Sequence, residues 1–387
     1  MKKVKLELVV IGLVLTCFSI LLVSVDTGGS EEDERTSHLE YNTARIISIV
    51  MDNTFFPDAD DPHFYGEPGE VRLGTIVYEI EVLRGSFAGL VLEAEYHMNS
   101  PADVYFQVGD RVSVRIFEFE EEINIVEIRH PERMELLLGV VAFFLLALCV
   151  IGGKRGVLAV LGLVFSVACV LLILIPLIIV GYSPLLVTFV ILTLVTVATI
   201  TLLAGVSAKG ISAILGCLSG VALAALFAQL VGFLLKVSGY NMGNATSIMQ
   251  MSDQVQVSGL FISSVLVASI GAIMDSSMSV ASALDEIKLA DPHISMKRLF
   301  KAGFNISRDV MGTMSNTLIL AFIGGSLSMM IFMQMTNTSF NQFINHDMIV
   351  MEAVKGVAGS FGIILATPLT AFISAKLLTM KLGGFQK

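Results

Sequence analysis

Long apolar runs constrain this chain more than any other feature, because a helix of about 20 apolar residues matches the thickness of a bilayer. Of the 387 residues, 55% are hydrophobic and only 15% are charged, whereas soluble domains are about 25% charged. The pattern predicts an α-helical polytopic membrane protein with eight transmembrane helices. They are predicted over residues 1–25, 136–153, 157–180, 184–204, 211–235, 258–275, 311–335 and 349–378.

The first run has two interpretations. It starts with a basic segment, MKKVK, and its apolar part continues from Leu6 to Val25. A secretory signal peptide has a shorter apolar core, of about 7–15 residues, and ends in small residues. We therefore favour an N-terminal transmembrane anchor over residues 1–25, with cleavage left as the alternative. The polar and acidic residues 26–43 are predicted to form a linker.

Residues 44–132 have the alternating pattern of half-buried strands. The segment LGTIVYEIEVL alternates apolar and polar residues, and VGDRVSVRIFEF does the same further along. About five such strands in a short segment predict a small all-β barrel of the OB or SH3-like kind. Residues 26–133 hold 24 acidic and 8 basic side chains, so this domain would repel phosphates and we exclude nucleic acid as a partner.

The basic residues outside the β domain predict the orientation of the chain. With eight spans and a cytoplasmic N-terminus, the outer loops 181–183, 236–257 and 336–348 contain one base, Lys236. Cytoplasmic segments carry an excess of Lys and Arg, so we expect both termini inside and the β domain outside. Residues 134–387 would form a seven-helix membrane domain. The bases assigned to the inside are Lys2, Lys3, Lys5, Lys154, Arg155, Lys209, Lys288, Lys297, Arg298, Lys301, Arg308, Lys376, Lys381 and Lys387.

Several long motifs resemble the YibE/F-like family of bacterial membrane proteins. They are ASIGAIMDSSMSVASALDEI around Asp275, FNISRDVMGTMSNTLILAFIGGSLS around Asn316 and VAGSFGIILATPLTAFISA near the end of the chain. Shorter matches are LRGSFAG, QVGDRV and LLAGVSAKGISAILG. The resemblance implies a multi-pass protein of the bacterial cytoplasmic membrane and implies no substrate.

The chain also resembles, less closely, the transporter core of the RND and SecD/SecF group. The shared features are an N-terminal span followed by an external domain, a membrane run that ends in an acid, and a basic linker before a Thr- and Asn-rich helix. That unit has six spans where eight are predicted here. This resemblance implies a transporter.

Asp275 is the first candidate functional residue, because polar groups at membrane depth are expensive and usually face a bundle interior or a wet path. On a continued helix Ser279 and Ser282 share its face. A carboxylate with hydroxyl neighbours can take up a proton or hold a cation. The alternative is an acid at the cytoplasmic edge that caps or solvates a helix.

Thr313, Asn316 and Thr317 are spaced i, i+3 and i+4 and share one helix face. They would either line a path with Asp275 or join helices by hydrogen bonds, as such residues do in membranes. The spacing favours the second role slightly, and both stay open.

Four secondary candidates carry charges in or beside the predicted spans: Glu352, Lys355, Lys209 and Asp309. Glu352 and Lys355 are spaced to form an ion pair. Thr367-Pro368 predicts a local weakening of the last helix, and the Gly216–Gly220 spacing predicts close helix packing.

No motif indicates an enzyme, a bound metal or a cofactor, and no nucleotide-binding loop is present,. Two functions therefore compete. The first is a secondary transporter or export component, coupled to protons or ions through Asp275. The second is a non-transporting scaffold or sensor whose β domain binds an extracytoplasmic protein or envelope partner. A homodimer, or assembly with a related membrane chain, is a further expectation.

Overall fold

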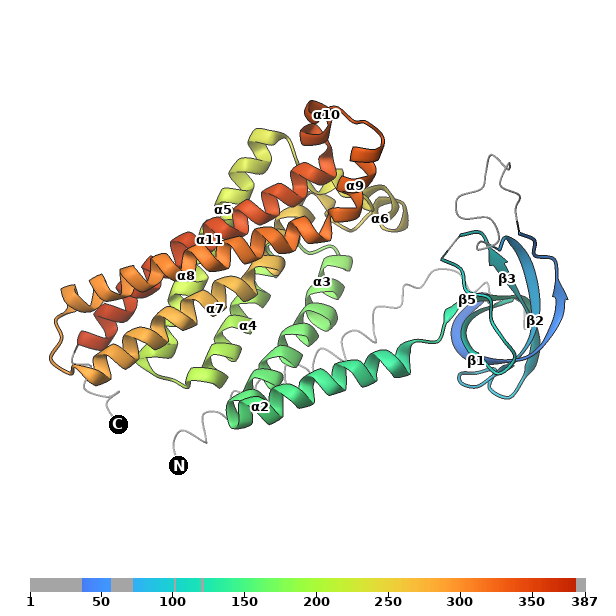
Figure 1. The fold of residues 1–387 in the computed structure, drawn as a ribbon, viewed down its shortest axis with the longest axis horizontal. Coiled ribbons are helices and arrows are strands. Elements are labelled where there is room, and N and C mark those ends of the chain that lie inside the picture. The colour runs from blue at the N-terminus through green and yellow to red at the C-terminus, as the bar shows by residue number, and fades with distance from the viewer. Residues whose placement is uncertain (1–36, 57–71, 101, 120–121, 381–387) are drawn as a thin grey trace. The chain divides into compact units, whose positions relative to one another are not determined.

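A computed structural model describes residues 37–56, 72–100, 102–119 and 122–380 of the chain. The predicted anchor over residues 1–25 lies outside the described residues. The chain divides after Leu146 into two compact units, a β-barrel that continues into the start of a helix, and a helical bundle (Figure 1).

The first unit contains a closed barrel of five strands, which confirms the predicted small β-barrel. The strands are β1 (Ser37–Asp52), β2 (Gly74–Val82), β3 (Val91–Met98), β4 (Arg111–Phe119) and β5 (Glu122–Pro131). Their order around the barrel is β1-β2-β3-β5-β4, and β1 closes it by pairing with β4. All pairs are antiparallel except β3 with β5. Strand β1 begins at Ser37, within the segment predicted as a linker.

Alternation along the strands builds the barrel core, since successive side chains point to opposite faces of a sheet. On β2, Ile76, Tyr78, Ile80 and Val82 are all buried. The hydroxyl of Tyr78 donates to the carbonyl of Phe106 at 3.2 Å, so its one polar atom is paired inside the core.

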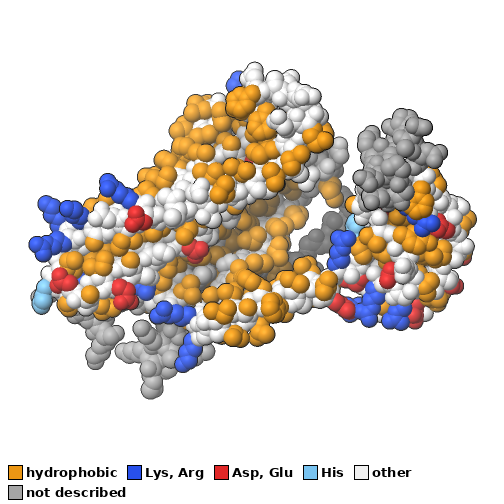
Figure 2. Space-filling view, in the orientation of Figure 1, with side chains coloured by type: hydrophobic (Ala, Val, Ile, Leu, Met, Phe, Trp, Pro, Cys, Tyr) orange, Lys and Arg blue, Asp and Glu red, His pale blue; other side chains and the backbone are white. Residues whose placement is uncertain are grey.

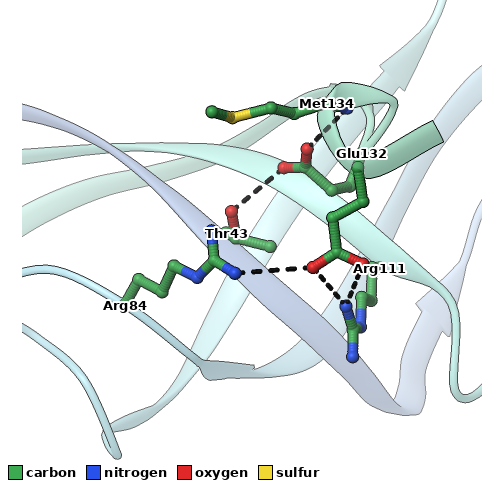
Figure 3. A network of polar contacts seen from close by, with 6 residues as sticks. Thr43, Arg84, Arg111, Glu132 and Met134 are labelled. Carbon is green, nitrogen blue, oxygen red and sulfur yellow. Dashed lines mark hydrogen bonds and ion pairs between the residues drawn. The ribbon is translucent and has the colours of Figure 1, made fainter. Parts of the chain in front are cut away.

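Two glutamates tie the end of the barrel to the helix that follows it (Figure 3). Glu132 accepts hydrogen bonds from the hydroxyl of Thr43 at 3.0 Å and from the amide of Met134 at 2.9 Å. Glu135, in the first turn of that helix, accepts from Arg111 at 2.9 Å and from Arg84 at 3.4 Å. An acid in the first turn also suits the positive end of the helix dipole.

The helical unit is built from long apolar helices. The main ones are α2 (Met134–Cys169), α4 (Pro184–Ala204), α5 (Ala208–Leu235), α7 (Leu260–Ala290), α8 (Met296–Gly325) and α11 (Asp347–Thr379). Shorter segments are η1 (Val170–Leu174), α3 (Ile175–Ile179), η2 (Gly239–Asn241), α6 (Ala245–Met251), η3 (Val257–Gly259), α9 (Leu327–Met335) and α10 (Phe340–Asn345).

Among the described residues, five helices are long and apolar enough to cross a membrane, or six if the bent pair α8–α9 counts as one span. These helices confirm the predicted helical membrane unit. The count of eight spans and the orientation stay predictions.

Three predicted spans differ in detail from the observed helices. Residues 136–153 and 157–180 belong to one helical stretch that is interrupted at Gly153, where the backbone is non-helical (φ 54°, ψ −135°). Just beyond this break Gly156 packs against the carbonyl of Leu148. The predicted span 311–335 bends by 55° between α8 and α9. Its sequence at the bend is Gly-Gly-Ser, which supports a helix poorly.

Helix α11 lies at the centre of the bundle and contacts α5, α7 and α8. Glycines on α5 let its backbone approach the backbone of α11 closely. Gly216 on α5 packs against Thr370, and a Cβ on Gly220 would lie 2.5 Å from the Cβ of Ala366. The later residue on α5, Gly220, meets the earlier residue on α11, Ala366, so the two helices are antiparallel. The contacts agree with the close packing predicted for Gly216–Gly220.

Candidate functional site

Asp275 lies on an exposed face of α7 that consists of small and polar residues. The exposed residues near it on that face are Ala268, Gly271 and Ser279, and Ser282 is partly exposed. The exposed face of α5 differs, since it carries Leu226, Leu230 and Phe233. Bulky apolar side chains suit contact with lipid, whereas the small polar face of α7 suits a neighbouring helix or water.

Contacts fix the register between α7 and α8. Leu284 on α7 contacts Gly303 on α8, and Gly359 of α11 touches both Ser269 and Leu318. Asp275 precedes Leu284 on α7 by as many residues as Gly312 follows Gly303 on α8. Because the two helices run in opposite directions, Asp275 and Gly312 lie at the same level.

This register sets Asp275 level with Gly312 and therefore beside the level of Thr313. A Cβ on Gly312 or on Gly271 would meet nothing within 4 Å. No described residue therefore packs against either glycine, of which Gly312 lies at the level of Asp275 and Gly271 one turn away. In the described part of the chain, no hydrogen bond or ion pair joins the Asp275 carboxylate to another residue.

The polar residues on α8 are exposed, and their hydroxyls bond within their own helix. Thr313 donates to the carbonyls of Asp309 and Val310, and Thr317 donates to Thr313 at 3.0 Å. Asn316 is exposed beside them. In the part of the chain that the structure describes, the two threonine hydroxyls thus donate to carbonyls of α8 itself, and their roles stay predictions.

Glu352 and Lys355 form the predicted pair on α11, with 2.6 Å between Lys355 Nζ and Glu352 Oε1. Glu352 also lines a cavity of about 260 Å³ at the bend between α8 and α9. Lys209 lies in the first turn of α5, and Asp309 is exposed on α8. Helix α11 continues through Thr367-Pro368, so the weakening predicted there produces no break.

Sequence reasoning missed a set of buried hydroxyls in the bundle. Within the described ranges, five such groups have no hydrogen-bond partner, namely those of Thr188, Thr199, Ser263, Ser277 and Ser315. Leaving a buried hydroxyl unpaired costs about 1–3 kcal/mol. Hydroxyl residues inside apolar runs were the available signal, but only the tertiary structure separates the paired from the unpaired ones.

The β-barrel carries a second polar and aromatic cluster. The guanidinium of Arg72 lies 3.3 Å from the carboxylate of Asp52 and stacks over the ring of Tyr105 at 4.1 Å. Hydrogen bonding from the hydroxyl of Thr54 holds the pKa of Asp52 below its usual range, and Arg72 contributes in the same direction,.

Near this cluster the end of β1 exposes Val50 and Met51, and the segment just after the strand exposes Phe55 and Phe56. The pairing of β1 with β2 shifts register between Ile49 and Met51. Such a bulge interrupts the alternation of faces, so consecutive apolar residues remain outside the barrel. The sequence pattern alone did not predict this surface.

Basic side chains gather at one end of the bundle, over the start of α8 (Figure 2). Ser374 near the end of α11 donates to Ser212 near the start of α5, which brings Lys376 and Lys209 to the same end. Over the described residues no group of three or more His, Cys, Asp or Glu side chains could hold a metal ion.

These features define a membrane protein in which an apolar helical bundle follows a small β-barrel. A model of the YibE/F-like protein family matches residues 140–380, more than half of the chain. The chain therefore belongs to the YibE/F-like family. No curated protein and no solved structure matches it, and the similarity to the RND and SecD/SecF group stays a prediction.

Proposed function

We propose that this protein is a secondary transporter or export component whose helical bundle moves a small solute or ion. The observation that carries the proposal is the position of Asp275. Asp275 lies at the middle of a membrane-length helix, on an exposed face of small and polar residues, at the level of Gly312. A carboxylate at such depth is expensive unless it faces a bundle interior or a water-filled path.

The coupling role of Asp275 follows from its lack of a protein partner in the described part of the chain. A carboxylate that is held in an ion pair, like that of Glu352, already has its counter-charge. Asp275 instead can bind and release a proton or a cation during a transport cycle. Ser279 and Ser282 on the same face, with Thr313, Asn316 and Thr317 on α8, would line the path.

The proposed orientation has the basic end of the bundle in the cytoplasm and the β-barrel outside. Cytoplasmic segments of membrane proteins are rich in Lys and Arg, and Lys209, Lys288 and Lys376 lie toward the same end of the bundle. The localisation we propose is the cytoplasmic membrane of a bacterium.

Cysteine accessibility tests whether the Asp275 face is wet. In a background with the four native cysteines replaced by alanine, Asp275→Cys and Ser279→Cys should react with a membrane-impermeant maleimide in proteoliposomes. We expect their reaction to be about tenfold faster than at lipid-facing positions, because a thiol must ionise in water to react.

The matched controls are Leu226→Cys on α5 and Leu186→Cys on α4, whose native side chains are 66% and 68% exposed. Both positions are exposed, as Asp275 and Ser279 are, but they lie among bulky apolar side chains. If Asp275→Cys reacted as slowly as Leu226→Cys, the face would contact lipid or another helix and the transport proposal would fail.

The second candidate function is a scaffold or sensor whose barrel binds a protein partner. The apolar surface at and just after the end of β1, where Phe55 and Phe56 are 55% and 53% exposed, favours it. Apolar side chains that are grouped and exposed mark interaction sites.

A photocrosslinking experiment in intact cells tests this candidate. A photoreactive phenylalanine analogue at Met51 should give discrete crosslinked bands, while the same analogue at Glu93, which is exposed on β3, should give none. Equal crosslinking at both positions, or none at Met51, would argue against a partner at this surface.

A further inference from the structure

One cavity of the bundle lies where α4 and α7 begin and α5 ends. Its volume is about 800 Å³, within the range of small-molecule sites. Its walls include Leu185, Phe233, Phe261 and Ile262, and its polar groups come from Ser183, Gln229, Lys236, Ser238, Gln256 and Ser258. The cavity is distinct from the Asp275 face, since neither Asp275 nor Ser279 lines it.

Hydrogen bonds between loops hold the rim of this cavity in place. The side chain of Gln256 donates to the carbonyl of Gly181 at 3.0 Å. The amide of Ser238 donates to Asn241, and Asn241 in turn donates to Asp347 at the start of α11. A rim fixed in this way provides a largely preformed site.

The cavity has an excess of positive charge. Of the described residues that line it, Lys236 is the one with a charged side chain, and no carboxylate is among them. The N-terminus of α4 lies at the cavity without a side-chain cap, which adds partial positive charge. The end of α5 is closed, because the amides of Lys236 and Val237 donate to carbonyls of its last turn.

Lys236 stands in a backbone conformation that normally selects glycine. Its φ is 56° at the end of α5, and glycine adopts this left-handed conformation without strain at helix ends. A lysine here gives up local backbone stability, and Lys236 is an exposed residue of the cavity lining. The residue with the strained backbone is thus also the residue that brings a charge to the cavity lining.

We propose that this cavity binds an amphipathic anion, with the anionic group at Lys236 and the apolar chain against Phe233, Phe261 and Ile262. Two sources share this chemistry, an anionic lipid of the bilayer and a free amphiphile such as a fatty acid. Binding at this site does not depend on transport through the Asp275 face.

Fluorescence quenching tests the proposal directly, because the chain contains no Trp. Phe233→Trp places a single reporter at the cavity, and Leu226→Trp places one on the same helix outside it. In the purified full-length protein in neutral detergent, 12-bromododecanoate should quench the Phe233→Trp signal more strongly than 12-bromododecanol does. The Leu226→Trp signal should not distinguish them. If Phe233→Trp fails to fold, Leu234→Trp is the second reporter.

Two substitutions of Lys236 separate binding from stability. In the Phe233→Trp protein, the further substitution Lys236→Gln should weaken bromododecanoate binding about fivefold, as expected for loss of an exposed ion pair. It should leave bromododecanol binding unchanged. Lys236→Gly should weaken acid binding equally while the unfolding temperature stays the same or rises, because glycine relieves the left-handed strain.

The source of the ligand is distinguished in nanodiscs. Stronger quenching of Phe233→Trp by brominated phosphatidylglycerol than by brominated phosphatidylcholine, lost in Lys236→Gln, would identify a lipid headgroup. Quenching by bromododecanoate alone would identify a free amphiphile. Equal quenching by the acid and the alcohol, or no effect of Lys236→Gln on the acid, would overturn the proposal.

Discussion

Gly216→Leu and Gly220→Leu are each expected to prevent the membrane bundle from packing correctly. At Gly220 a Cβ alone would lie 2.5 Å from Ala366, and at Gly216 it would overlap the side chain of Thr370. Overpacking a tight core typically costs about 1–3 kcal/mol. We expect the upper end of this range, because the atoms in the way include the α11 backbone itself.

The measurement is the fraction of full-length protein that remains monodisperse in detergent after heating, read by size-exclusion chromatography. The matched controls are Gly271→Leu and Gly312→Leu, since a Cβ at either position meets nothing within 4 Å. Equal losses in the two groups would show that the α5–α11 contact is not the tight one. Because Gly271 and Gly312 flank Asp275, these controls also measure how much room that face offers.

Asp275→Asn is expected to remove most of the labelling of the helical bundle by dicyclohexylcarbodiimide. This apolar reagent enters the bilayer and reacts with carboxyl groups that can accept a proton there. Asp275 is exposed on its helix face and has no hydrogen-bond partner among the described residues, whereas Glu352 is held 2.6 Å from Lys355. Asp275 should therefore be the main site of labelling in the bundle.

Intact-protein mass spectrometry after a timed reaction in proteoliposomes gives the measurement. The control Glu352→Gln should leave the labelling at its original level, while Lys355→Met should add labelling at Glu352 by removing its partner. Retention of full labelling in Asp275→Asn would show that this carboxylate is not accessible from the membrane. The proton-coupling role would then lose its support.

The sequence by itself determined the class of the protein and the local structure of both units. Apolar runs of bilayer length predict helices because backbone groups in hydrocarbon must bond within their own segment. Alternation in segments such as IVYEIEV predicts barrel strands because side chains point to opposite faces. The Glu352–Lys355 pair was predictable for the same reason, since its geometry depends only on helix periodicity.

The tertiary structure decided which residues lie at the same level of the bundle and which polar groups are left unpaired. The level of Asp275 with Gly312 depends on the packing of Leu284 against Gly303 and of Gly359 against Ser269 and Leu318. No local pattern encodes that register. The cavity at Lys236 likewise requires the ends of three helices, α4, α5 and α7, to meet, and the left-handed backbone of Lys236 is set by how α5 ends. Local periodicity is a property of neighbouring residues, whereas a site is a property of residues that only packing brings together.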